Sequence, residues 1–307
     1  MTVSRRKFLQ VAGAAGCVLL TGRKPADAAG AADAAQVGHA GAKDTGVEFY
    51  GMLVDTTKCI GCRSCEEACN AKNGLPKPEV SFSSDSVFEK KRDTTPEAFT
   101  VLNKYPNPKD PDKPIFVRKQ CMHCNQPACA TACLVKALEK TPEGPVKYNK
   151  DRCMGCRYCM VSCPFDAPKY EYNSAMPYLK KCVFCFDRVV KGEQPACVEA
   201  CPEGASMFGK RRELIEIARQ RIYQNPDKYY PYIYGEREAG GTSMMFLSSV
   251  AVEQLDFRMN VGYVPYPEKT TGFLYAVPHI FILWPTFLYG LNYLTHSKDK
   301  ESEHGEK

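Results

Sequence analysis

Cysteine is the residue type whose spacing points most directly to chemistry in this chain, because sixteen of the seventeen cysteines fall into four groups. Every group begins with two cysteines separated by two residues and ends with two separated by three. Thiolates are strong metal ligands, so this repetition indicates bound metal. Groups one to four are, in order, Cys59, Cys62, Cys65 and Cys69; Cys121, Cys124, Cys129 and Cys133; Cys153, Cys156, Cys159 and Cys163; and Cys182, Cys185, Cys197 and Cys201.

Group three is followed by Pro164 and has the complete run C-x2-C-x2-C-x3-C-P, which binds [4Fe–4S] clusters. Groups one and two keep its shape, and group four keeps its C-x3-C-P end. Each cubane cluster takes four thiolates, so the sixteen cysteines predict four [4Fe–4S] clusters. In proteins with two such runs, the fourth cysteine of one run ligates the cluster of the other. The sequence therefore predicts two interleaved bacterial-ferredoxin-like units.

Three other interpretations of the cysteines compete with this one. A disulfide framework is a common meaning of an even cysteine count in an exported chain, but adjacent cysteine triplets make poor disulfide partners. Structural zinc uses C-x2-C pairs, but a zinc ion needs four ligands and has no use for the interleaved fourth cysteine. A decayed or three-iron site would lack a cysteine, whereas all sixteen expected positions are filled.

The segments between the groups predict short elements of both kinds, and hence an α+β fold over residues 49–210. A strand is expected to begin at Phe49, and a strand over 146–148 is expected to lead into group three. Between these, residues 135–138 are expected to start a short helix. Residues 75–114 contain seven prolines, so they are predicted to be an irregular insertion that runs over the surface.

Residues 211–270 are predicted to be an extension that covers the ferredoxin-like units. Its first part has apolar residues at helical spacing, including Leu214, Ile215 and Ala218, which predicts an amphipathic helix over 210–221. A strand is expected at 244–252.

The N-terminus has the pattern of a twin-arginine export signal, with Arg5 and Arg6 before an apolar run. Cleavage after Ala28 is expected, which makes residues 1–28 the signal peptide and residues 29–48 a flexible Ala- and Gly-rich linker. Cys17 lies inside the apolar run and is interpreted as an ordinary apolar residue. The twin-arginine route exports folded proteins, so clusters can be inserted in the cytosol first.

The net charge supports no nucleic-acid partner. The whole chain carries 41 Lys and Arg against 35 Asp and Glu, a net charge of +6. Residues 1–28 hold five of the basic and one of the acidic residues, so the rest of the chain carries only +2. That near balance gives no basic footprint for DNA or RNA.

The C-terminal part predicts one transmembrane helix over 271–294. Residues 272–294 contain no acidic or basic residue except His279, and 23 residues are enough to cross a bilayer. Pro278 and Pro285 would interrupt its backbone hydrogen bonding. Residues 295–307 are expected to be a cytoplasmic tail, because Lys298 and Lys300 follow the span.

The sequence suggests more than one role for each of four polar side chains near the cysteines. His123, between two cysteines of group two, is expected to hydrogen-bond near a cluster rather than ligate it, since four cysteines are already present. Lys169, Lys180 and Lys181 are interpreted as solvated residues, with a role in raising cluster potentials or docking a partner as the alternative.

Taken together, the export signal, the four cysteine groups, the stretch Y-G-E-R-E-A-G-G-T at 234–242 and the C-terminal span resemble the iron–sulfur subunits of periplasmic, membrane-bound nickel–iron hydrogenases (HybA type). The cysteine groups are also similar to those of electron-transfer subunits of molybdopterin oxidoreductases such as formate dehydrogenase-N. In nitrate reductase relatives a tryptophan replaces one cysteine of group three. Cys159 is present here, so no three-iron site is implied, and Leu134 departs from a common proline.

The resemblance implies a non-catalytic electron-transfer subunit on the periplasmic face of the bacterial inner membrane. Its partners would be the large and small catalytic subunits of a hydrogenase, or alternatively the catalytic subunit of a formate dehydrogenase or other molybdoenzyme. An integral membrane subunit would pass the electrons to quinone. An exported, disulfide-stapled binding protein is the alternative from a different class.

The resemblance also implies which cysteines share a cluster, because the family pairs group one with group four and group two with group three. The first cluster would lie nearest the catalytic subunit and the fourth nearest the membrane. The implied ligands are Cys59, Cys62, Cys65 and Cys201 for cluster one; Cys182, Cys185, Cys197 and Cys69 for cluster two; Cys121, Cys124, Cys129 and Cys163 for cluster three; and Cys153, Cys156, Cys159 and Cys133 for cluster four.

Overall fold

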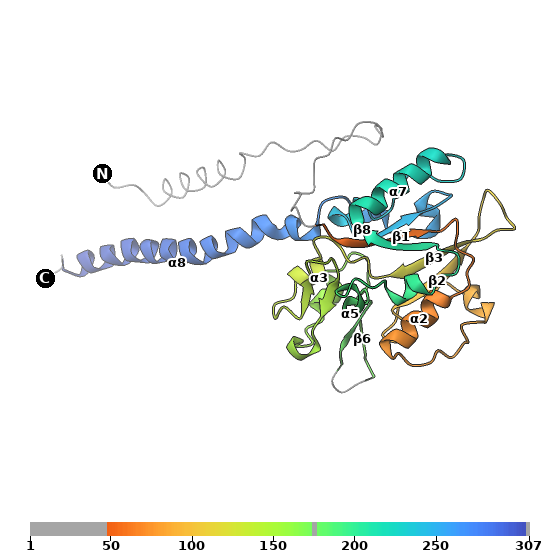
Figure 1. Cartoon of the computed structure of the whole chain (residues 1–307). Helices are drawn as coiled ribbons and strands as arrows, with labels where there is room; N and C mark the ends of the chain where they lie inside the picture. Colours follow the sequence, from red (N-terminus) through yellow and green to blue (C-terminus); the bar gives the residue numbers. More distant parts are fainter. Residues whose placement is uncertain (1–47, 174–176, 305–307) are drawn as a thin grey trace. The chain divides into compact units, whose positions relative to one another are not determined.

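A three-stranded sheet forms the centre of the fold (Figure 1). The computed structural model describes residues 48–173 and 177–304, so the expected signal with Arg5 and Arg6 and nearly all of the linker lie outside the described residues. Strand β1 (Tyr50–Asp55) is the middle strand, antiparallel to β8 (Ser206–Lys210) and parallel to β9 (Met244–Leu247). All four residues of β9 are buried. The segment expected only to cover the cysteine-bearing units therefore builds their central sheet.

Helix α7 (Arg211–Gln224) packs on this sheet and confirms the predicted amphipathic helix. Its buried residue Ala218 follows the buried Leu214 and Ile215 by four and three positions, so the three share one face. They form a hydrophobic cluster with Leu53 of β1 and Met245 of β9.

Each cysteine group places one or two of its members in a helix and the others in the adjoining loops. Residues 135–138, expected to start a helix, instead form a turn that leads into a strand; the helix comes earlier, at Ala128–Thr131. The elements are α2 (Ser64–Asn73), α3 (Ala128–Thr131), β4 (Leu138–Lys140), β5 (Val146–Tyr148), η2 (Lys150–Arg152), α4 (Tyr158–Val161), β6 (Lys169–Tyr170), β7 (Leu179–Lys180), α5 (Phe186–Val189) and α6 (Ala196–Glu199).

The proline-rich insertion 75–114 is more ordered than its composition suggests. It contains the 3-10 turn η1 (Asp85–Glu89) and strand β2 (Thr100–Tyr105), which pairs antiparallel with β3 (Ile115–Gln120). The prolines fall outside these strands, where no ladder hydrogen bond is lost. The expectation of an irregular segment is thus wrong for β2.

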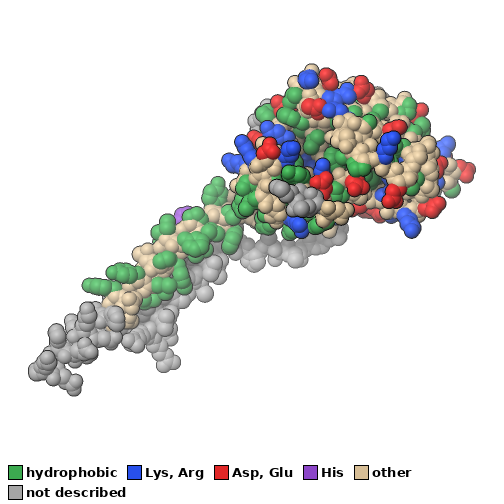
Figure 2. Space-filling view, turned by 90° about the horizontal axis from the view of Figure 1, so that it is seen from below, with side chains coloured by type: hydrophobic (Ala, Val, Ile, Leu, Met, Phe, Trp, Pro, Cys, Tyr) green, Lys and Arg blue, Asp and Glu red, His purple; other side chains and the backbone are tan. Residues whose placement is uncertain are grey.

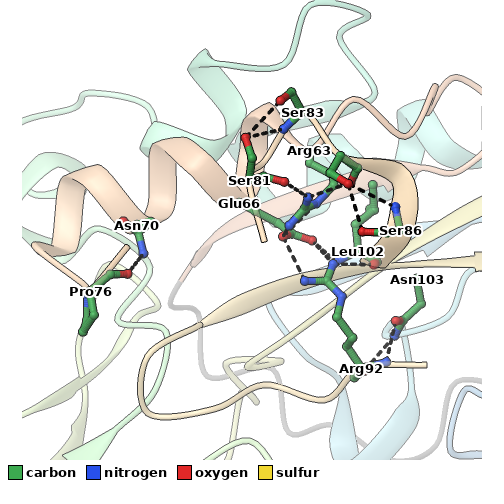
Figure 3. Close-up of polar contacts among 11 residues, drawn as sticks. Arg63, Glu66, Asn70, Pro76, Ser81, Ser83, Ser86, Arg92, Leu102 and Asn103 are labelled. Atoms are coloured by element: carbon green, nitrogen blue, oxygen red, sulfur yellow. Dashed lines mark hydrogen bonds and ion pairs between the residues drawn. The ribbon is translucent and has the colours of Figure 1, made fainter. Parts of the chain in front are cut away.

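A buried carboxylate fastens this insertion to α2 (Figure 3). Glu66 of α2 is 5% exposed and accepts hydrogen bonds from the guanidinium groups of Arg63 (3.0 Å) and Arg92 (2.5 Å) and from the backbone N–H of Leu102 (2.5 Å). Arg63 also donates to the carbonyl of Ser81 at 2.8 Å. One carboxylate therefore links α2, which carries Cys65 and Cys69, to the insertion at Arg92 and Leu102.

We expect Glu66→Ala to lower the free energy of unfolding by about 3–5 kcal/mol, the usual cost of removing one partner from a buried ion pair. The loss leaves Arg63 fully buried without its carboxylate. The measurement is the thermal unfolding midpoint of the anaerobic protein, with Glu67→Ala as the control because Glu67 is the exposed neighbour in the same helix. Equal midpoints for the two variants would contradict the role given to Glu66.

The C-terminal helix α8 (Tyr266–His304) is long and apolar enough to span a membrane. Its apolar window has a mean hydropathy of 1.4 and is 0% buried inside the protein. Figure 2 shows hydrophobic side chains along this helix, while charged side chains are spread over the body. Pro278 and Pro285 lie inside the helix, and the helix continues to His304, through most of the expected tail. Before α8 come the short 3-10 turns η3 (Glu238–Gly240), η4 (Val252–Leu255) and η5 (Met259–Val261).

Candidate metal centres

The four cysteine loops share one backbone feature. The residue directly before the second cysteine of each group has a left-handed φ: 80° at Gly61, 47° at His123, 75° at Gly155 and 58° at Phe184. At Gly61 a Cβ would lie 2.5 Å from the ring of Phe116, so only glycine fits. The backbone of all four loops therefore turns in the same sense directly before the second cysteine.

Groups one and four exchange their last cysteines. Set one, which we define as Cys59, Cys62, Cys65 and Cys201, lines a single cavity together with Arg118. Set two lines a second cavity. Its members are Cys69, Cys182, Cys185 and Cys197.

Groups two and three are arranged in the same crossed way. Set four is Cys133, Cys153, Cys156 and Cys159, which line a third cavity together with Tyr148 and Tyr170. Set three is Cys121, Cys124, Cys129 and Cys163. Burial raises the pKa of Cys124 well above its ordinary value, and the neighbouring thiols of Cys163, Cys121 and Cys129 raise it further.

The thiols of each set surround a space rather than a point. Within the part of the chain that the structure describes, no three His, Cys, Asp or Glu side chains are placed to hold a single metal ion. A cubane cluster, in contrast, takes its four thiolates at the corners of a cube. Burial raises the pKa of Cys159 to about 11, and bound iron would supply the positive charge that a thiolate needs there. The residues present therefore fit a cluster better than one ion.

The four sets follow one another in numerical order. Burial raises the pKa of Cys65 to about 12, and Cys197 of set two adds to the effect. Burial also raises the pKa of Cys182 of set two, and Cys121 of set three raises it further. Burial likewise raises the pKa of Cys129 to about 12, with Cys159 of set four contributing. Each set is thus a close neighbour of the next.

Solvent reaches this row of sets mainly at its two ends. Among the sixteen described cysteines only Cys62 of set one and Cys156 of set four are exposed. Large apolar side chains lie exposed beside them, namely Ile60 at one end and Met154 and Tyr158 at the other. The two middle sets have only buried and half-buried cysteines.

The structure gives His123 a packing role and a polar one. Its ring is 1% exposed and lies 5.0 Å from the ring of Phe184, centroid to centroid. Its Nδ1 accepts a hydrogen bond from the backbone N–H of Val146 at 3.0 Å. Burial, followed by the nearby Lys181 and Lys140, holds the pKa of His123 well below its usual range, so the ring is neutral.

The three lysines considered from the sequence differ in their surroundings. Lys169 and Lys180 pair with carboxylates, Lys169 with Asp166 at 2.8 Å and Lys180 with Glu171 at 3.2 Å. Lys181 is 4% exposed and donates to the carbonyl of Val146 at 2.6 Å. Lys181 is therefore not the solvated residue that was expected.

Arg118 was not singled out from the sequence, although it lines the cavity of set one. It lies on β3 and is 2% exposed. The only sequence signal is a basic pair, Arg118 and Lys119, in a short strand that ends one residue before Cys121. Nothing in that pattern says which of the two residues faces inward.

Comparison with known proteins defines the class of this fold and these cysteine sets. A family model described as a 4Fe-4S dicluster domain matches residues 113–211, and one described as a 4Fe-4S binding domain matches residues 50–71. The protein is thus an iron–sulfur protein of the ferredoxin type.

The relatives narrow the class to a family. The chain is 45% identical to a protein of Nitratidesulfovibrio vulgaris over 97% of this chain and 78% of the relative. It is 36% identical to the hydrogenase-2 operon protein HybA of Shigella flexneri over 83% of both chains. It is 34% identical to the iron-sulfur subunit of the nitrate-inducible formate dehydrogenase of Escherichia coli, over 64% of this chain and 66% of the relative. The chain therefore belongs to the HybA-type family of iron–sulfur electron-transfer subunits, as its resemblance predicted.

Proposed function

We propose that this chain relays electrons through four [4Fe–4S] clusters between the catalytic subunits of a periplasmic hydrogenase and a quinone-reactive membrane subunit. The observation that carries the proposal is the row of four cysteine sets with an exposed cysteine only at each end. A relay must exchange electrons with partners at its ends and protect its middle from solvent. Neighbouring sets lie close together, because in each pair a thiol of one set raises the pKa of a thiol in the other. Such closeness suits electron transfer from cluster to cluster.

In this proposal each set ligates one cluster, with the fourth cysteine crossing over between paired groups. The cavities lined by sets one, two and four support this crossing, because each contains one cysteine from the partner group. All sixteen described cysteines are then used, which leaves none in the described part of the chain for a nickel site. The subunit is therefore proposed to be non-catalytic.

We propose that set one faces the catalytic partner and set four faces the membrane. Helix α8 begins beside α3, which carries Cys129 of set three: Gln126 donates to the carboxylate of Glu268 at 3.2 Å. The span thus starts next to the later sets of the row. A HybA relative that matches 83% of the chain favours a hydrogenase partner over a formate dehydrogenase partner, whose iron-sulfur subunit matches 64%.

The location proposed for the chain is the periplasmic face of the inner membrane, reached by twin-arginine export through Arg5 and Arg6 and held by α8. The sequence of the first 28 residues supports export. Cell fractionation tests this location. In a strain that has both arginines changed to lysine and no partner with an export signal, we expect the cluster-loaded chain in the cytosol.

The test of the function is anaerobic purification of the tagged full chain from the membranes of its own host. A broad brown absorbance that dithionite bleaches, with about sixteen iron atoms per chain, is expected for four clusters. Co-purification of a nickel-containing subunit would support a hydrogenase partner. Co-purification of a molybdopterin subunit would instead show that the partner is a molybdoenzyme. A colourless protein without iron would overturn the proposal.

A further inference from the structure

Arg118 lies between set one and set two. It lines the first cavity, where Cys59 and Cys65 are also found. Its Nη2 is 2.6 Å from the sulfur of Met52, a residue that lines the second cavity. Burial alone would lower the pKa of Arg118, but the thiolates of Cys197 in set two and Cys65 in set one outweigh it and raise the pKa. One guanidinium is thus within electrostatic reach of two cysteine sets.

This guanidinium is buried without a counter-ion. Arg118 is 2% exposed, and its Nε and Nη1 have no hydrogen-bond partner in the described residues. No carboxylate of the described residues forms an ion pair with Arg118. A buried charge with no partner is strongly disfavoured, so an anion is needed beside it.

Two other arginines, the half-buried Arg211 and the buried Arg63, have all-protein partners. Arg211 donates to the carbonyls of Thr242 (2.7 Å) and Glu236 (2.7 Å), and Arg63 pairs with Glu66. These two side chains hold loops together, and their donors are used in doing so. Nε and Nη1 of Arg118 have no such partner in the part of the chain that the structure describes, although Arg118 lines the cavity of set one. These free donors indicate an anionic partner in the cavity.

We propose that Arg118 is the shared counter-ion of the clusters in sets one and two and that it raises the reduction potential of both. The inference rests on the proposed function, since it requires clusters in these two sets. A cubane cluster with four thiolate ligands is an anion and gains one further negative charge on reduction. A fixed positive charge therefore stabilises the reduced form more than the oxidised form, and net charge is one of the factors that set cluster potentials.

The test is an anaerobic redox titration followed by electron paramagnetic resonance on the complete complex. Arg118→Gln and Arg118→Met remove the charge, Arg118→Lys keeps it, and Lys119→Gln is the matched control. Lys119 is the next residue of the same strand, but its side chain is 41% exposed and pairs with Asp93 at 3.1 Å. Signals missing from Cys62→Ser and from Cys185→Ser identify the clusters of sets one and two.

We expect both neutral variants to disfavour reduction of these two clusters by about tenfold or more, which is about 59 mV toward negative potential for each tenfold in a one-electron couple. The other two clusters should keep their potentials, and Arg118→Lys and Lys119→Gln should titrate like the wild type. This result is specific, because a purely structural arginine would not shift a potential in two of four clusters.

Each remaining outcome overturns something definite. Unchanged potentials in neutral variants that keep all their iron would overturn the role of Arg118 while leaving the relay intact. Loss of the clusters from both neutral variants but not from Arg118→Lys would make Arg118 a residue that holds the clusters, and the proposal about potentials would be wrong. A wild-type chain without clusters in sets one and two would instead overturn the proposed function on which the inference depends.

Discussion

Replacing Cys133 with serine is expected to disrupt the cluster of set four and to spare the cluster of set three, although Cys133 is a neighbour in sequence of the set three cysteines. The cavity of set four brings Cys133 together with Cys153, Cys156 and Cys159. Loss of one thiolate should release that cluster, so iron should fall by about a quarter in a four-cluster chain; conversion to a three-iron cluster would instead remove about one iron in sixteen. Electron delivery to the membrane partner should stop, because the relay loses its last member.

The measurement is a comparison of three variants by electron paramagnetic resonance. The signal missing from Cys133→Ser should be the one missing from Cys156→Ser and should differ from the one missing from Cys124→Ser. The reciprocal variant Cys163→Ser should lose the signal of set three. Loss of the same signal from Cys133→Ser and Cys124→Ser would refute the crossed ligation.

Ending the chain after Gly272 is expected to release it from the membrane with all its clusters. The truncation removes the apolar length of α8, and all the described cysteines precede it. It keeps Tyr266, which packs against the largest hydrophobic cluster of the body. Hydrogen oxidation with an artificial electron acceptor should persist while reduction of quinone fails.

The control for this truncation is a chain that ends after Leu294, which keeps the apolar segment and loses only the tail. Both chains should be expressed in cells without the membrane partner, and washed membranes should be probed for each. The longer chain is expected in the membranes and the shorter one in the soluble fraction. Retention of the shorter chain on washed membranes would mean that α8 is not the anchor.

Sequence reasoning reached the metal chemistry because ligand spacing is a local property. A C-x2-C pair alone could bind zinc, but the run C-x2-C-x2-C-x3-C-P indicates an iron–sulfur cluster whatever the rest of the fold does. Helix α7 could be predicted equally well, since its buried positions repeat with the helical period. Its boundaries and those of α8 shifted by several residues, because polar ends carry little periodic signal.

The central sheet could not be predicted in the same way. Strand β9 pairs in parallel with β1, and the hydroxyl of Thr56 reaches the carbonyl of Leu247, 191 residues later. No local pattern states such a pairing. Strand β2 was hidden by the prolines around it, and its pairing with β3 became visible only in the structure.

Burial of charge was the other feature that sequence reasoning missed. Lys180 and Lys181 are adjacent and of one type, yet Lys180 pairs with a carboxylate and Lys181 is buried among carbonyls. Arg118 and Lys119 are a second pair of adjacent basic residues with different surroundings. Successive residues of a strand point to opposite faces, so one is buried and the other is not. Which member faces the cysteines depends on the register of β3, and the sequence alone leaves that register open.

The exposure of Cys62 and Cys156 has a consequence for oxygen tolerance. Dioxygen oxidises an iron–sulfur cluster that it can reach, so it is expected to attack the clusters at both ends of the row before those in the middle. Damage there would leave two intact clusters that can no longer be charged or discharged. The stability of the subunit in air then depends on its assembly into a complex. The proteins that cover Cys62 and Cys156 would protect the end clusters from oxygen as well as exchange electrons with them.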